Sequence, residues 1–64
     1  MYKFEAEALV RYRSGGNKTR KFQFTYGKEL SKWNMNDYGT IEKYLGAKKD
    51  VQGDVSIIDI KEIE

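Results

Sequence analysis

The residues best suited to binding chemistry are basic side chains on either side of a glycine pair, Gly15-Gly16. The cluster consists of Arg11, Arg13, Lys18, Arg20 and Lys21. Such cations bind phosphates and carboxylates through charge and through donated hydrogen bonds. Trp33 is a further candidate, because a partly exposed Trp is a common anchor in protein interfaces. We expect these residues to bind an anionic partner. The alternative is that their charge only keeps a small protein soluble.

Catalysis and metal binding find little support. The chain has no His and no Cys, the residues that general acid–base and nucleophilic mechanisms use most often. Asp50, Asp54 and Asp59 lack the spacing of a calcium loop. The run Gly15-Gly16-Asn17-Lys18-Thr19 is shorter than a phosphate-binding P-loop and opens a strand, so we interpret it as a tight turn. We therefore predict a protein that is not an enzyme and holds no cofactor.

Length and composition bound the fold. A chain of 64 residues has room for one hydrophobic core, so we predict a single domain over residues 1–64. Disulfides are excluded, but one Trp, five Tyr and three Phe can supply a core. No stretch approaches the ~20 apolar residues of a membrane span, and the N-terminus lacks a secretory pattern. A cytoplasmic protein without membrane contact is the expectation.

Charge is divided unevenly along the chain. Residues 1–32 carry eight Lys or Arg and three Asp or Glu, which is +5, whereas residues 33–64 carry four and seven, which is −3. A polarised small protein can present a basic face to an anionic partner. The same division also arises where two halves of one domain attract each other.

Alternation of apolar and polar residues predicts a β-hairpin from Tyr2 to Tyr26. Residues that face the core on one strand must lie opposite residues that face the core on the other strand. This leaves only registers in which the numbers of two paired residues have an even sum. We favour a sum of 32, with the loop Gly15-Gly16-Asn17 and with Val10 opposite Phe22, because small side chains then face large ones. A sum of 34 is the alternative. Aromatic side chains share one face and are predicted to build the core: Tyr2, Phe4, Tyr12, Phe22, Phe24 and Tyr26.

Like charges meet on the other face of this predicted hairpin. Arg11 lies opposite Lys21 in the favoured register, and Arg13 takes that place in the alternative. Such a pair is unfavourable unless an external anion or an acidic partner relieves it. No aromatic residue is predicted on this open face, which argues against a platform for stacking single-stranded nucleic acid.

The second half of the chain predicts a helix and a closing strand. A helix capped by Asn36 or Asp37 runs to about Leu45, with Tyr38, Ile41, Tyr44 and Leu45 on one face and with Gly46 as a left-handed stop. The segment between the hairpin and this helix is a helical turn or irregular. Residues 54–63 read as a strand, in which either both faces are partly covered or a β-bulge near Ile58-Asp59 shifts the parity.

Together these elements predict an α+β protein of ββαβ order. It is a three-stranded antiparallel sheet, strand order 2-1-3, with one short helix on one face. In size and pattern alone the layout resembles small phage and mobile-element proteins, and this resemblance carries no functional residue.

Two functions fit these features. The first is a non-catalytic protein-interaction module, of the inhibitor, adaptor or assembly-subunit type, that presents the basic hairpin to an acidic partner surface. The alternative is a small nucleic-acid-binding accessory protein that contacts phosphates with the hairpin tip. A homo-oligomer formed through a sheet edge is a further option.

Overall fold

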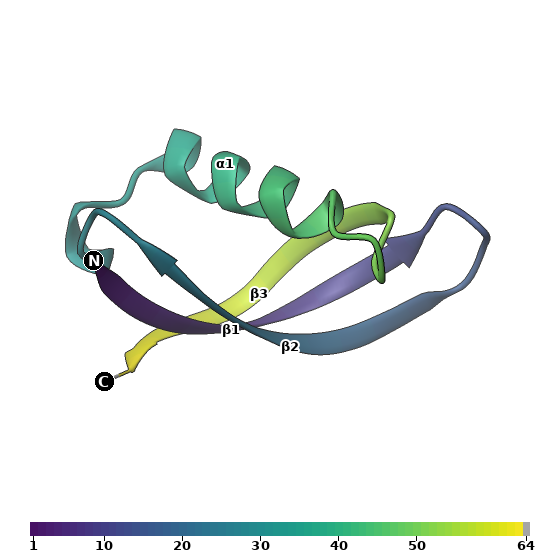
Figure 1. Cartoon of the computed structure of the whole chain (residues 1–64), viewed down its shortest axis with the longest axis horizontal. Coiled ribbons are helices and arrows are strands. Elements are labelled where there is room, and N and C mark those ends of the chain that lie inside the picture. The colour runs from purple at the N-terminus through teal and green to yellow at the C-terminus, as the bar shows by residue number, and fades with distance from the viewer. Residues whose placement is uncertain (64) are drawn as a thin grey trace.

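The computed structural model describes residues 1–63 as a twisted antiparallel sheet with a helix across one face (Figure 1). The elements follow the chain as β1 (Tyr2–Tyr12), β2 (Asn17–Tyr26), the short 3-10 helix η1 (Leu30–Lys32), α1 (Met35–Gly46) and β3 (Gly53–Ile63). The sheet order is β2-β1-β3, and both pairings are antiparallel. The predicted α+β architecture, its ββαβ order and its strand order are confirmed.

The hairpin turn lies closer to the N-terminus than the favoured loop. The Gly15 N–H donates to the Tyr12 carbonyl at 2.9 Å, and the Tyr12 N–H donates to the Gly16 carbonyl at 3.0 Å. Gly15 and Gly16 have φ of 106° and 85°, a left-handed conformation that glycine adopts without steric cost. The glycines therefore complete a turn centred on Arg13 and Ser14, and the prediction of a tight turn here is confirmed.

The predicted hairpin register is wrong. Paired residues have a sum of 28, with Phe4 opposite Phe24 and Ala6 opposite Phe22, so neither 32 nor 34 holds. The earlier turn accounts for the shift, because Asn17 already belongs to β2 and faces Arg11. Large rings oppose large rings at one end of the hairpin instead of facing small residues.

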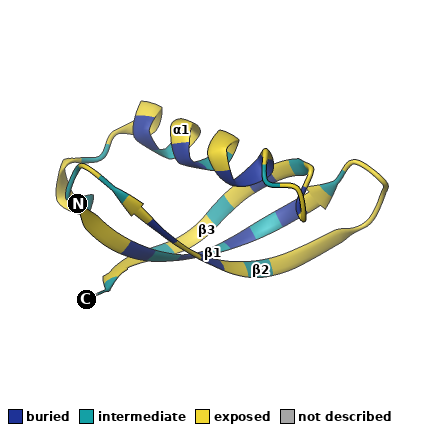
Figure 2. Cartoon of the chain, viewed as in Figure 1, coloured by how far each residue is buried: buried dark blue, intermediate teal, exposed yellow. Residues whose placement is uncertain are grey.

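The core lies between the sheet and α1, as the dark blue residues of Figure 2 show. The central strand supplies its floor, since Phe4, Ala6, Ala8 and Val10 have no exposed surface. The remaining buried apolar residues are Phe22, Phe24, Ile41, Leu45, Val51 and Val55. Among the six predicted core rings, Tyr12 and Tyr26 are half-buried and Tyr2 is 40% exposed.

The cap of the helix is Asn34, which lies two residues before Asn36 and three before Asp37, the predicted caps. The Asn34 side chain accepts hydrogen bonds from the N–H groups of Asn36 and Asp37, and the Asp37 carboxylate accepts one from the Asn34 N–H at 2.9 Å. This is a capping box, in which Asp37 occupies the third helical position. Asn36 and Asp37 are thus inside the helix, and the prediction of either as its cap is wrong.

The far end of α1 and its inner face also differ from the prediction. Gly46 is the last helical residue and is not left-handed; within residues 1–63, Gln52 is the non-glycine residue with positive φ. A Cβ on Gly46 would collide with the Gly53 carbonyl oxygen, so this glycine permits close packing of α1 on β3. Ile41 and Leu45 point into the core as predicted, but Tyr44 is 56% exposed.

Of the two alternatives predicted for the closing strand, the structure has the bulge. Ala8 pairs with Ile57 while Glu7 pairs with Asp59, which leaves Ile58 as the extra residue of β3. The bulge lets Val55, Ile57 and Ile60 turn toward the core, whereas Ile58 is 60% exposed.

Candidate binding surface

The observed register divides the predicted basic cluster between the two faces of the hairpin. Arg11 and Lys21 are at odd positions and lie on the open face of the sheet, while Lys18 and Arg20 lie opposite Val10 and Ala8 on the face that carries α1. Arg13 is exposed in the turn. The five residues therefore do not form one patch on one face.

The predicted cationic pair across the hairpin is absent. Lys21 lies opposite Glu7, and Arg11 lies opposite Asn17 on one side and Asp54 on the other. Opposite charges on neighbouring strands attract, so the open face satisfies these cations itself. The expectation of Arg11 or Arg13 facing Lys21 followed from the wrong register.

The open face as a whole is electrically balanced. The Lys61 ammonium lies 3.7 Å from the Glu5 carboxylate across the β1–β3 pair. Four cations and four carboxylates occupy this face, giving a net charge of zero: Lys3, Arg11, Lys21, Lys61, Glu5, Glu7, Asp54 and Asp59. Its other strand residues include no aromatic side chain, as predicted. A polyanion gains little from such a surface.

A different concentration of charge forms where the connection after α1 meets the hairpin. The Arg20 guanidinium donates to the Asp50 carboxylate at 2.9 Å and to the Asp50 main-chain carbonyl at 3.3 Å. The Arg13 N–H donates to the Gln52 carbonyl at 3.1 Å. These bonds fix residues 47–52 beside the hairpin tip, at the end of the molecule opposite the two termini (Figure 1).

We call this region the basic end. Its cations come from the turn, from β2 and from the connection after α1: Arg13, Lys18, Arg20, Lys48 and Lys49. Asp50 is bound among them, and the neighbouring Arg11 and Asp54 face each other and add no net charge. The basic end therefore carries +4, while the remaining six cations and eight carboxylates carry −2. The hydrogen bonds from Arg20 hold the pKa of Asp50 below its ordinary value, so Asp50 stays ionised.

Lys48 and Lys49 are the site residues that sequence reasoning missed. They are 28 or more positions from Arg20, and the bonds from Arg20 to Asp50 and from Arg13 to Gln52 bring them near it. Lys48 is half-buried, with its ammonium 5.4 Å from the Tyr44 ring centre, and Lys49 is exposed. The surplus of basic residues in the first half of the sequence gave no signal for them.

Trp33 is held in place by contacts within the protein. Its indole N–H donates to the Lys28 carbonyl at 2.9 Å, and its ring centre lies 5.0 to 6.3 Å from four other aromatic rings. The four are Phe4, Phe24, Tyr26 and Tyr38. Edge-on contacts of this kind stabilise a core. Trp33 is half-buried at the end of the sheet far from the basic end, so it does not extend that surface.

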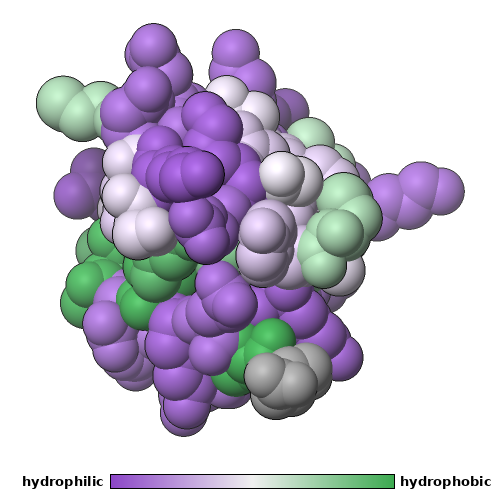
Figure 3. All heavy atoms as spheres, turned by 90° about the vertical axis from the view of Figure 1, so that its left-hand side faces the viewer, coloured by the Kyte–Doolittle hydropathy of each residue, from purple (hydrophilic) through white to green (hydrophobic). Residues whose placement is uncertain are grey.

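Figure 3 looks at that far end, where apolar side chains, in green, form small areas between hydrophilic ones. A buried carboxylate belongs to this region: Asp37 accepts hydrogen bonds from the Tyr26 hydroxyl at 2.7 Å and from the Lys28 ammonium at 3.1 Å. With the Asn34 N–H it has a full set of donors, and we assign it a structural role.

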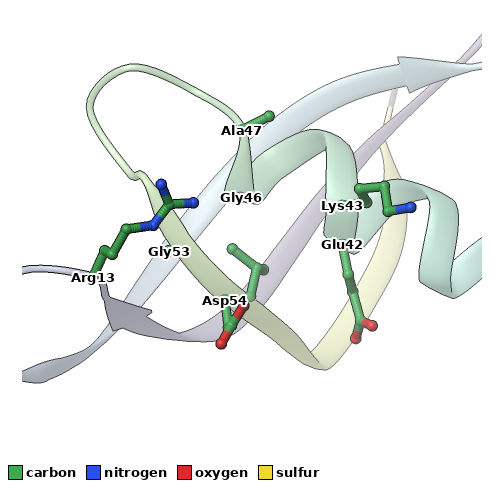
Figure 4. A pocket seen from close by; sticks show the side chains of 8 residues that line it. Arg13, Glu42, Lys43, Gly46, Ala47, Gly53 and Asp54 are labelled. Atoms are coloured by element: carbon green, nitrogen blue, oxygen red, sulfur yellow. The ribbon is translucent and has the colours of Figure 1, made fainter.

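A shallow depression lies between the hairpin tip, the end of α1 and the start of β3 (Figure 4). Arg13 and Lys43 contribute positive charge to it, and Glu42 and Asp54 contribute negative charge. Glu42 is not a free acid, because its carboxylate accepts a hydrogen bond from the Ile57 N–H at 2.9 Å. The depression therefore holds no unengaged pair of carboxylates for acid–base chemistry.

Asp50, Asp54 and Asp59 do not come together in the structure. Asp50 is bound to Arg20, Asp54 faces Arg11, and Asp59 faces Glu7, so the three acids are separated. Residues 1–63 contain no group of three carboxylates arranged to hold a metal ion. In that part of the chain no helix is long and apolar enough to cross a membrane.

Comparisons with protein-family models, with curated proteins and with solved structures found no match for this chain. What the structure defines is an α+β protein of ββαβ order with a cationic end.

Proposed function

We propose that this protein is a non-catalytic interaction module that places its basic end against an acidic surface of a partner protein. The observation that supports the proposal is a net charge of +4, from five cations on three separate segments together with Asp50, set against −2 on the remainder of the chain. Charge of one sign at one end of a molecule 33 Å long steers association with an oppositely charged partner.

The basic end also has a defined shape. Arg20 is held between Asp50 and the Phe22 ring, whose centre is 5.0 Å from the guanidinium carbon. The hairpin turn and the connection after α1 form two short projections fixed to each other by the Arg13–Gln52 bond. A guanidinium held in this way loses less conformational entropy on binding than a freely moving one.

Nucleic acid is the second candidate for the same end, since phosphates also bind Lys and Arg. The open sheet face gives it no support, because that face is neutral and without aromatic side chains. A contact confined to five cations favours a local acidic surface over a long polyanion.

Charge reversal with a matched control tests the proposal. Lys18→Glu with Lys49→Glu alters the basic end, whereas Lys3→Glu with Lys32→Glu changes the net charge equally at the other end. All four side chains are exposed. Each immobilised variant is used for capture from a lysate of the native host, with and without nuclease.

The expected result is a nuclease-resistant protein partner that the first variant retains at least about tenfold less well and that the control retains fully. Retention should also fall with added salt. Equal losses in both variants would contradict a role for the basic end, and a signal removed by nuclease would favour the nucleic-acid function instead.

A further inference from the structure

The two edges of the sheet differ in how far they are protected. At the β3 edge the Ile58 bulge interrupts the strand, and Glu42 from α1 accepts the hydrogen bond of the Ile57 N–H at 2.9 Å. Bulges and covering side chains are common means of preventing strand addition at an edge. The β3 edge is therefore closed around its midpoint.

The β2 edge has no such protection within residues 1–63. In an antiparallel pair of strands, residue pairs that share main-chain hydrogen bonds alternate with pairs that do not. The bond from the Tyr12 N–H to the Gly16 carbonyl shows that Tyr12 and Gly16 form a hydrogen-bonded pair. The even-numbered residues of β2 consequently bond to β1. The odd-numbered residues direct their N–H and carbonyl groups away from the sheet: Thr19, Lys21, Gln23 and Thr25.

This open edge has no bulge, and its charged side chains, which all lie in its first half, are cations. The pairing of β2 with β1 has no bulge over its whole length. Asn17–Tyr26 contains Lys18, Arg20 and Lys21 and no Asp or Glu. Arg20 is already bound to Asp50, but Lys18 lies on the face of α1 and Lys21 on the open face. A strand added beside this half of β2 therefore meets positive charge on both of its faces.

We infer that the β2 edge accepts an extended acidic segment of the partner protein as a fourth strand of the sheet. Main-chain hydrogen bonds to the outward amides supply affinity in this mode, and side-chain charges select the segment. A second copy of β2 fits less well, because it brings three more cations and no carboxylate to the joint. The inference rests on the proposed function and adds the conformation and position of the bound segment.

The probe is a capped ten-residue peptide in which Glu alternates with Thr, and the control peptide has Lys in place of Glu. Amide hydrogen exchange of the isotope-labelled protein is followed by NMR. The Glu peptide should slow exchange at Thr19, Lys21, Gln23 and Thr25 by about tenfold or more, and leave Ile60 and Glu62 on the other edge unchanged. The Lys peptide should leave all six unchanged.

Proline substitutions separate edge pairing from charge alone. Gln23→Pro removes one outward donor of β2, and Glu62→Pro removes one from β3, at edge positions where proline is tolerated. The first should weaken peptide binding at least about tenfold and the second should not. Thermal unfolding checks that both variants fold, and if Gln23→Pro does not, the exchange pattern of the unaltered protein decides.

Each other outcome overturns the inference. The inference fails if no peptide binding is detected at millimolar concentration. It also fails if the four amides are protected without peptide and sedimentation shows a dimer, because a second copy of the chain would then occupy the edge. If Gln23→Pro binds the peptide normally while Lys18→Glu with Lys49→Glu does not, the edge inference fails and the proposed function of the basic end stands.

Discussion

Arg20 on β2 binds both the carboxylate and the main-chain carbonyl of Asp50, and so joins the hairpin to the connection between α1 and β3. The side chains are 26% and 69% exposed, so solvent screens the pair. Its effect is to position Lys48 and Lys49 more than to stabilise the fold.

We expect Arg20→Ala to speed amide exchange at Lys48 and Val51 while the melting temperature changes by less than about 5 °C. The reason is that the connection loses its tie to β2 but the core beneath it is untouched. High salt should reproduce part of the effect in the unaltered protein. A large fall in melting temperature would show that Arg20 carries core stability.

Stability should depend on pH through Asp37. The Asn34 N–H, the Tyr26 hydroxyl and the Lys28 ammonium hold the pKa of Asp37 below its ordinary value, against the opposing effect of burial. A carboxyl with a depressed folded-state pKa stabilises the fold above its unfolded value of ~4, and this is lost as the pH falls through the folded value. Asp37→Asn should therefore lower stability at neutral pH and flatten the acid side of the stability profile, measured by urea unfolding.

Stability should also depend on pH at the alkaline end, through Tyr26. Its hydrogen bond to Asp37, and then burial, raise the pKa of the Tyr26 hydroxyl. That contribution is present below the unfolded value of ~10 and is lost as the pH rises through the folded one. Tyr26→Phe should remove part of the alkaline loss and also weaken the acid loss, because it takes away one of the donors that lower the pKa of Asp37. If the profiles of Asp37→Asn and Tyr26→Phe match the unaltered protein, the pair has no linkage to folding.

Two glycines of α1 should respond in opposite directions to the same change. Gly39→Ala places its methyl group in open space and should stabilise the protein by ~0.5 to 1 kcal/mol through helix propensity. Gly46→Ala forces the methyl group against the Gly53 carbonyl and should destabilise it by roughly 1 to 3 kcal/mol despite the same gain in propensity. Denaturant unfolding of both variants compares them directly, and a stabilising Gly46→Ala would refute the close contact.

Engineered disulfides can verify the hairpin register, since the chain has no cysteine of its own. Leu9 lies opposite Thr19 in a pair that does not share main-chain hydrogen bonds, so Leu9→Cys with Thr19→Cys should oxidise readily and add about 2 to 4 kcal/mol of stability. Leu9→Cys with Gln23→Cys matches the register with a sum of 32 and should not close, because the residues are about 13 Å apart. Mass spectrometry after oxidation distinguishes the two.

Local patterns were sufficient to predict the architecture of this protein. Alternation between Tyr2 and Tyr26 predicted the hairpin, and the change of parity around Ile58 predicted the bulge, because both depend on which face of a strand is buried. The position along the strands was not predictable in this way. Opposing small and large residues satisfied the same rule, whereas the protein groups Phe4, Phe24 and Tyr26 around Trp33.

The helix ends and the candidate site were also predictable only in part from the sequence. Asn34, Asn36 and Asp37 are all capping residue types, and the reciprocal bonds between Asn34 and Asp37, with Asp37 also held by Tyr26 and Lys28, make the first of them the cap. The hairpin cations were found from sequence, but their distribution between faces required the register. Lys48 and Lys49 required a long-range ion pair that no local pattern encodes.

The unequal sheet edges also set a limit on assembly. If two molecules were to join through β2, each would be left with only the β3 edge, which the Ile58 bulge and Glu42 interrupt. Growth by strand pairing would then terminate after one step, because polymerisation needs two receptive edges on every subunit. Strand pairing would therefore stop at two chains, and fibre formation is disfavoured by Ile58, which lies outside the core, and by Glu42.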